Sequence, residues 1–141
     1  MFAALKNKFT GSVAKFSGRK DFLEAVCAAS ALVAFADGDA SDQEVDATVK
    51  SITSNAQLSG SFSTREIETT AERMMQRAQG GRVGRNGLYK EIEDITADHD
   101  MAETVLLTAL DVADNGGIDD KERTVLSEIA KRMSLNLSSY L

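Results

Sequence analysis

A short acidic phrase occurs twice in this 141-residue chain, and the repetition constrains the fold more than any other feature. The sequence reads DGDASDQE at 37–44 and NGGIDDKE at 115–122, 78 positions later. Each copy follows a strongly apolar stretch, 25–36 or 105–113, and opens an amphipathic one. We predict an all-α fold, a compact single-domain bundle of about six to seven helices that contains an internal helix–acidic loop–helix duplication.

Capping patterns and apolar periodicity place the expected helices. A cap residue followed three positions later by glutamate is typical of a helix start. This pattern occurs at Ser41/Glu44, Ser63/Glu66, Asp100/Glu103 and Asp119/Glu122. The expected helices span 21–36, 41–56, 63–79, 88–96, 100–113 and 119–133, with a closing turn at 137–141. The glycine-rich stretch 80–87 is expected to be a loop, because glycine disfavours helix.

The charge is divided unevenly between the start of the chain and its body. Residues 1–20 carry five basic side chains and no acid, so the net charge of −6 leaves −11 on residues 21–141. An acidic body argues against nucleic-acid binding, which needs basic groups to neutralise phosphates. The longest apolar run, 25–36, is too short to span a bilayer, and no signal peptide is visible. We therefore expect a cytoplasmic protein without nucleic-acid partners.

The first 20 residues read as a basic amphipathic helix, separate from a helical domain at 21–141. Its apolar stripe consists of Phe2, Leu5, Phe9, Val13 and Phe16. The stripe either packs on the bundle, which we favour, or lies on an anionic membrane surface beside its lysines.

The acidic phrases have two explanations that stay open at this point. Helix capping accounts for Ser41, Glu44, Asp119 and Glu122 without a ligand. Gly38 and Gly116 are expected to supply a left-handed conformation at the turn before each of these helices. Capping leaves a surplus of acids, namely Asp37, Asp39, Asp42, Asp114 and Asp120. Two carboxylates about 6 Å apart repel by roughly 3 kcal/mol at an effective dielectric of about 20, so crowding favours solvent or a hard cation that prefers oxygen ligands.

Neither phrase is an EF-hand, and no catalytic set is visible. In the first copy, an EF-hand would need glycine where Asp42 stands and glutamate where Thr48 stands. Any cation is therefore expected to bind weakly. His99 is the single histidine. Cys27 is the single cysteine, and the apolar stretch around it predicts that it is buried. We expect no catalytic or cofactor-binding residues, and hence no enzyme.

The repeated phrase resembles the tellurite-resistance protein TerB family. The similarity is carried by LDVADNGGIDDKE at 110–122 with EIAK at 128–131, by 36–44 in the first half, and by the glycine-containing stretch 83–88. A basic amphipathic leader is also similar. The resemblance implies a bundle of about seven helices, acidic loop residues that chelate metal, and a role in tellurite, oxidant and phage stress responses. It also implies membrane-associated protein partners.

The resemblance extends the candidate metal set residue by residue. Asn115 stands where the family has aspartate, and Asp114 is placed to compensate for the lost charge. The full candidate set is Asp37, Asp39, Asp42, Glu44, Asp114, Asn115, Asp119, Asp120 and Glu122, with Ca²⁺ or Mg²⁺ as the expected cation. The expected function is a non-enzymatic stress-response interaction module. The alternative is a peripheral membrane adaptor on the inner face of the membrane, which docks through residues 1–20 and recruits partners through its acidic body.

Overall fold

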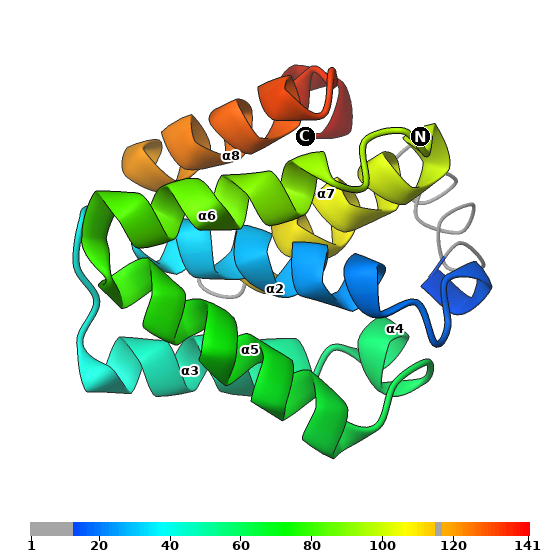
Figure 1. Cartoon of the computed structure of the whole chain (residues 1–141). Helices are drawn as coiled ribbons and strands as arrows, with labels where there is room; N and C mark the ends of the chain where they lie inside the picture. The colour runs from blue at the N-terminus through cyan, green and yellow to red at the C-terminus, as the bar shows by residue number, and fades with distance from the viewer. Residues whose placement is uncertain (1–12, 115–116) are drawn as a thin grey trace.

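The computed structural model describes residues 13–114 and 117–141, and they form a helical bundle (Figure 1). No strand occurs within those two ranges. The helices are α2 Lys20–Ala34, α3 Asp42–Thr53, α4 Ala56–Ser59, α5 Thr64–Gln79, α6 Gly81–Glu93, α7 His99–Ala113 and α8 Asp120–Arg132, with a 3₁₀ helix at Leu137–Tyr140. The all-α prediction is confirmed, and so is the expected duplication.

Helix α2 lies at the centre of the bundle and is apolar on nearly every side. It contacts α3, α5, α6, α7 and α8, which surround it in Figure 1. Its residues from Phe22 to Val33 are buried except for Glu24. A helix with an apolar surface all round is stable only when other helices cover it completely. The apolar run in the sequence therefore became the core of the domain.

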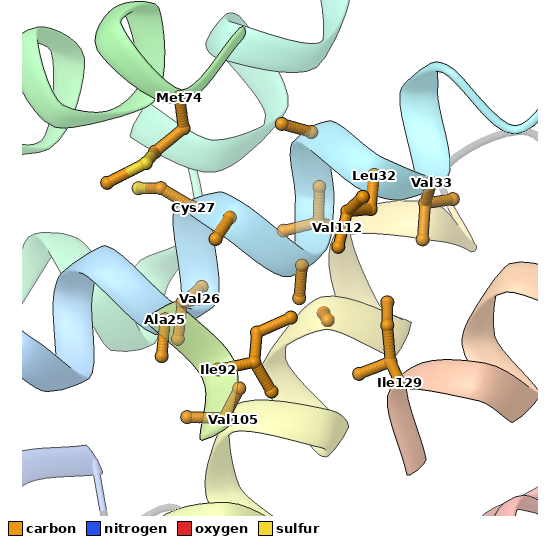
Figure 2. Packing of buried hydrophobic residues seen from close by; sticks show 14 of the residues in the cluster. Ala25, Val26, Cys27, Leu32, Val33, Met74, Ile92, Val105, Val112 and Ile129 are labelled. Atoms are coloured by element: carbon orange, nitrogen blue, oxygen red, sulfur yellow. The ribbon is translucent and has the colours of Figure 1, made fainter. Parts of the chain in front are cut away.

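Side chains from α2 interlock with those of its neighbours in the core (Figure 2). Ala25 and Val26 lie near Ile92 of α6 and Val105 of α7, while Cys27 points toward Met74 of α5. Each of these side chains is completely buried. The predicted burial of Cys27 is confirmed, and the burial raises the pKa of its thiol to about 12.

The stretch 80–87 is helical, so the prediction of a loop there was wrong. Helix α6 begins at Gly81, whose φ of +80° lets the chain reverse directly after α5. A Cβ at Gly84 would lie 1.8 Å from the carbonyl oxygen of Arg77 on α5. The glycines weaken an isolated helix by about 1 kcal/mol each, but here a glycine permits a backbone contact between α5 and α6 that offsets this cost.

The helices that flank the duplicated phrase correspond between its two copies. Helices α2 and α7 both span 15 residues, and each is followed by a loop and then by a helix with a complete capping box. Gly38 adopts the expected positive φ, at +96°. In the second loop the positive φ of +94° belongs to Gly117, whereas the predicted residue, Gly116, lies outside the described residues.

Two of the four predicted helix starts differ in detail. The Ser63 hydroxyl accepts a hydrogen bond from the Glu66 N–H, but the Ser63 N–H donates no reciprocal bond to the Glu66 carboxylate. Helix α7 starts earlier than expected, because Asp98 rather than Asp100 is its cap and accepts from the Met101 N–H at 3.1 Å. The pattern missed Asp98 because Met101, not glutamate, stands three positions later, but Asp98 has the extended backbone that a cap requires. The short helix α4 was not predicted.

The described end of the leader packs on the bundle. Val13 and Phe16 are buried, and the Phe16 ring lies 5.2 Å from the Phe22 ring. These two residues of the apolar stripe therefore pack on the bundle, which was the favoured alternative. Phe2, Leu5 and Phe9 lie outside the described residues. Within the described ranges, no helix has both the length and the apolar character needed to cross a lipid bilayer.

Candidate functional site

The two acidic phrases meet at one surface hollow of about 390 Å³, which we call the acidic hollow. Its floor is formed by Val33 and Ala34 near the end of α2. Its acidic lining is drawn from both copies and comprises Asp37, Glu44, Asp119, Asp120 and Glu122. Residues some 80 positions apart in the sequence thus come together because α2 places its C-terminal end beside the start of α8.

The first side of the hollow is shaped by the capping box of α3. The Glu44 N–H donates to the Ser41 hydroxyl at 3.1 Å, and the Ser41 N–H donates to Glu44 Oε1 at 3.0 Å. Upstream, the Asp39 N–H donates to Asp37 Oδ1 at 3.3 Å, and the Ala40 N–H donates to Asp39 Oδ1 at 2.9 Å. The acids of this loop therefore also hold the loop's own backbone.

The second side repeats the arrangement with aspartate as the cap. The Glu122 N–H donates to Asp119 Oδ1 at 2.8 Å, and the Asp119 N–H donates to Glu122 Oε1 at 2.9 Å. Lys121 lies between the acids of this side and is the single basic residue in the lining of the hollow. Sequence reasoning did not select Lys121, although it stands inside the repeated phrase.

The hollow is strongly negative but does not present a finished set of metal ligands. Five carboxylates and one ammonium group give its lining a formal charge of −4. Glu44 and Glu122 each use Oε1 for capping. Across the described residues, no three histidine, cysteine or acidic side chains are grouped tightly enough to hold a metal ion. The arrangement attracts cations over several ångströms, and direct coordination would require the side chains to move.

The remaining candidate residues lie outside the lining of the hollow. Asp39 and Asp42 are exposed, the former turned to its own loop by the hydrogen bond to Ala40 and the latter in the first turn of α3. Asp114 is the C-cap of α7 and lines a different hollow beside Lys50 of α3. Asn115 lies outside the described residues. The structure thus brings together five of the nine candidates.

Comparison with protein families assigns the chain to a family. Residues 23–140 match the family described as "Tellurite resistance protein TerB". The chain belongs to the TerB family. The match includes both acidic phrases, both capping boxes and every helix from α3 to α8. Searches of curated proteins and of solved structures found no match to the chain.

The TerB match contains the whole acidic hollow and excludes the whole leader. Every residue in the lining of the hollow falls between Val33 and Glu122, well inside the matched range. Residues 1–22 fall before it. In this TerB-family domain the glycine-containing stretch 83–88, one of the segments that carried the resemblance, forms part of helix α6.

Proposed function

We propose that this TerB-family domain is a non-enzymatic interaction module of a stress response, of the tellurite, oxidant or phage type, whose acidic hollow holds a divalent cation. The observation that supports the proposal is the meeting of carboxylates from both acidic phrases at one hollow. Carboxylate oxygens are the ligands preferred by Ca²⁺ and Mg²⁺. The proposal rests on the five candidate residues that line the hollow, and the other four stay predictions from the sequence.

Binding at this hollow is expected to be weak. A tight calcium site has six to eight oxygen ligands in a loop built for them, whereas Glu44 and Glu122 are already engaged in capping. We therefore propose a cation that keeps most of its water and interacts with Asp37 and Asp120 from opposite sides of the hollow. Because the two residues belong to different helix pairs, an ion between them would stabilise the folded domain through mass action.

The proposal is tested by calorimetric titration with Ca²⁺, Mg²⁺ and Mn²⁺. The wild type is compared with Asp37→Asn/Asp120→Asn, which removes one charge from each side of the hollow. The matched control is Glu68→Gln/Glu72→Gln, which removes two exposed carboxylates of α5 that lie outside the lining. Binding heat and an increase in melting temperature should appear in the wild type and the control and vanish in the hollow variant. Equal responses in all three proteins would contradict the cation proposal.

As an interaction module, the domain would bind other proteins, including membrane-associated proteins of the same stress response. The chemistry of its two most reactive side chains supports a non-enzymatic role. Burial holds Cys27 protonated, and His99 lies on an exposed helix surface with Nε2 3.4 Å from Glu103 Oε1. Neither side chain lines the acidic hollow.

A second candidate function is peripheral membrane binding through residues 1–20. The observation that favours it is the exposure of Lys15, Arg19 and Lys20 at the described end of the leader. Against it, Val13 and Phe16 are held in the core. Co-sedimentation with phosphatidylserine vesicles tests it, with the full chain compared with Lys15→Gln/Arg19→Gln/Lys20→Gln. Ca²⁺-independent binding that needs these residues would support the adaptor, and equal partitioning would contradict it.

A further inference from the structure

A second hollow, of about 560 Å³, lies on the other side of the first acidic loop, between the end of α2 and one face of α6 and α8. Figure 1 shows this part of the molecule, where the loop that leaves α2 passes the start of α6. We call it the arginine groove, because Arg82, Arg85 and Arg132 line it together. Asp37 belongs to the lining of both hollows.

Two of the three guanidinium groups have no carboxylate partner among the described residues. Arg82 is exposed and enters none of the ion pairs found there. Arg85 makes one long hydrogen bond, from Nη1 to the Gly38 carbonyl oxygen at 3.4 Å. The chain has 22 acidic residues and 16 basic ones. Two neighbouring arginines that stay unpaired in such an acidic protein leave a local excess of positive charge.

The third arginine has a structural role in the groove. Arg132 lies over the Tyr89 ring, 4.3 Å from its centre, and is held by Glu93 and Glu128 at 3.1 Å each. This cation–π contact fixes the tyrosine ring at the edge of the groove. Arg132 is therefore already neutralised, and the positive charge of the groove comes from Arg82 and Arg85, opposed by one lining carboxylate, Asp37.

The floor of the groove is apolar. Leu32 and Phe35, at the end of α2, are almost fully buried, and Val125 and Tyr89 are half-buried. Along α6, Arg82, Arg85 and Tyr89 recur at intervals of three and four residues, which places them on one helix face. The groove therefore presents guanidinium donors above an aromatic and aliphatic floor.

We propose that the arginine groove binds an acidic peptide segment of a partner protein, with an apolar side chain between its acids. Carboxylates would form paired hydrogen bonds with Arg82 and Arg85, a geometry that the guanidinium fork favours. The apolar side chain would lie on the floor beside Phe35 and Tyr89. This inference does not depend on cation binding in the acidic hollow.

Charge and size favour this occupant over others. The chain's own first 20 residues carry five basic groups and no acid, so they do not complement the arginines. A long polyanion, whether nucleic acid or a lipid surface, would extend past the groove and meet the carboxylates of the acidic hollow beside it, which a short peptide avoids. A single phosphate would fill a small part of about 560 Å³ and leave the apolar floor uncovered.

The test uses a fluorescein-labelled pool of short peptides in which acidic residues flank one aromatic or aliphatic position. Fluorescence polarisation is measured with the full chain, with Arg82→Gln/Arg85→Gln and with Arg85→Lys. The matched control, Lys20→Gln/Arg65→Gln, removes the same charge from the starts of α2 and α5, at the opposite end of the bundle (Figure 1). Circular dichroism confirms that each variant is folded.

The wild type and the matched control should bind the acidic pool equally, and Arg82→Gln/Arg85→Gln should bind at least about tenfold more weakly. Arg85→Lys should lose part of the affinity, because lysine keeps the charge but not the fork. An equal loss of affinity in the matched control would show that binding depends only on the net charge of the protein, and would overturn the proposal. So would binding of inorganic phosphate or phosphatidylserine vesicles in place of the peptides, or no peptide binding up to about 1 mM.

Discussion

Gly84 of α6 lies directly against the backbone of Arg77 in α5, so that a methyl group added at Gly84 would come within 1.8 Å of the Arg77 carbonyl oxygen. We expect Gly84→Ala to lower the free energy of unfolding by about 2 kcal/mol or more, because the helices must separate to admit the methyl group. Urea denaturation measures this change.

Gly87→Ala is the matched control for that substitution. Its added methyl group would lie 2.8 Å from Arg77 Nη2, the end of a flexible side chain that can shift. Alanine also favours helix over glycine by about 1 kcal/mol. Gly87→Ala should therefore lower the free energy of unfolding much less than Gly84→Ala does. Equal stability of the two variants would contradict the proposed backbone contact.

Two substitutions of Asp119, the cap of α8, distinguish the effect of its hydrogen bond from the effect of its charge. Asp119→Ala should cost about 1 kcal/mol of stability, since the Glu122 N–H loses its acceptor. Asp119→Ser should cost far less, because Ser41 performs the same capping in the first copy and the change removes one charge from the acidic hollow. Thermal unfolding at low ionic strength measures both. If the serine variant loses as much as the alanine variant, the role of Asp119 is electrostatic rather than capping.

The pair formed by Tyr140 and Glu103 predicts a loss of stability in alkali. The Tyr140 hydroxyl donates a hydrogen bond to Glu103, and burial, this bond and the nearby negative charge raise the pKa of Tyr140 to about 12. Unfolded tyrosine titrates at about pH 10. Tyr140 thus keeps its proton to a higher pH in the folded state than in the unfolded state. The contribution of the pair to the free energy of unfolding is therefore complete below about pH 10 and is lost as the pH rises from about 10 to 12.

Spectrophotometric titration near 295 nm and unfolding measured across this pH range check that prediction. Tyr140→Phe should remove the high-pH component of the titration and flatten the pH dependence of stability. Tyr89, whose pKa burial also raises, remains as an internal reference. A Tyr140→Phe protein with the wild-type pH dependence would contradict the assignment.

The thiol of Cys27 should be unreactive toward disulfide reagents in the folded protein. This thiol is completely buried, and desolvation raises its pKa to about 12, whereas reaction with disulfide reagents requires an exposed thiolate. Labelling with Ellman's reagent should proceed only as fast as the domain opens, and rapidly in guanidinium. Fast labelling of the native protein would show that α2 is accessible. The lone cysteine is therefore not expected to sense oxidants, even if the domain acts in an oxidant response.

Helix positions were predictable because their causes are local. The apolar runs around Val26 and Leu106 and the caps at Ser41 and Asp119 specify helices without reference to the rest of the chain. The stretch 80–87 was mispredicted because its glycines have a tertiary role. Their local preference disfavours helix, and the close approach at Arg77 that compensates is visible only once α5 is in place.

The site was predictable in part for the same reason. The capping function of Glu44 and Glu122 follows from spacing within each phrase, and is confirmed. Which acids share one hollow depends on how α2 and α8 pack, so Asp42 and Asp114 could not be separated from Asp37 and Asp120 beforehand. The arginine groove had a readable signal, the face formed by Arg82, Arg85 and Tyr89, but it emerges only when 81–93 is taken as a helix.

The central position of α2 also bears on how the duplicated halves depend on each other. Helices from both copies cover α2: α3 belongs to the first copy, and α7 and α8 belong to the second. The first half alone would expose the face of α2 that α7 and α8 cover, and the second half alone would lack α2 altogether. The two repeats have therefore ceased to be separable modules, and a chain cut between them could regain its structure only by reassembling both fragments.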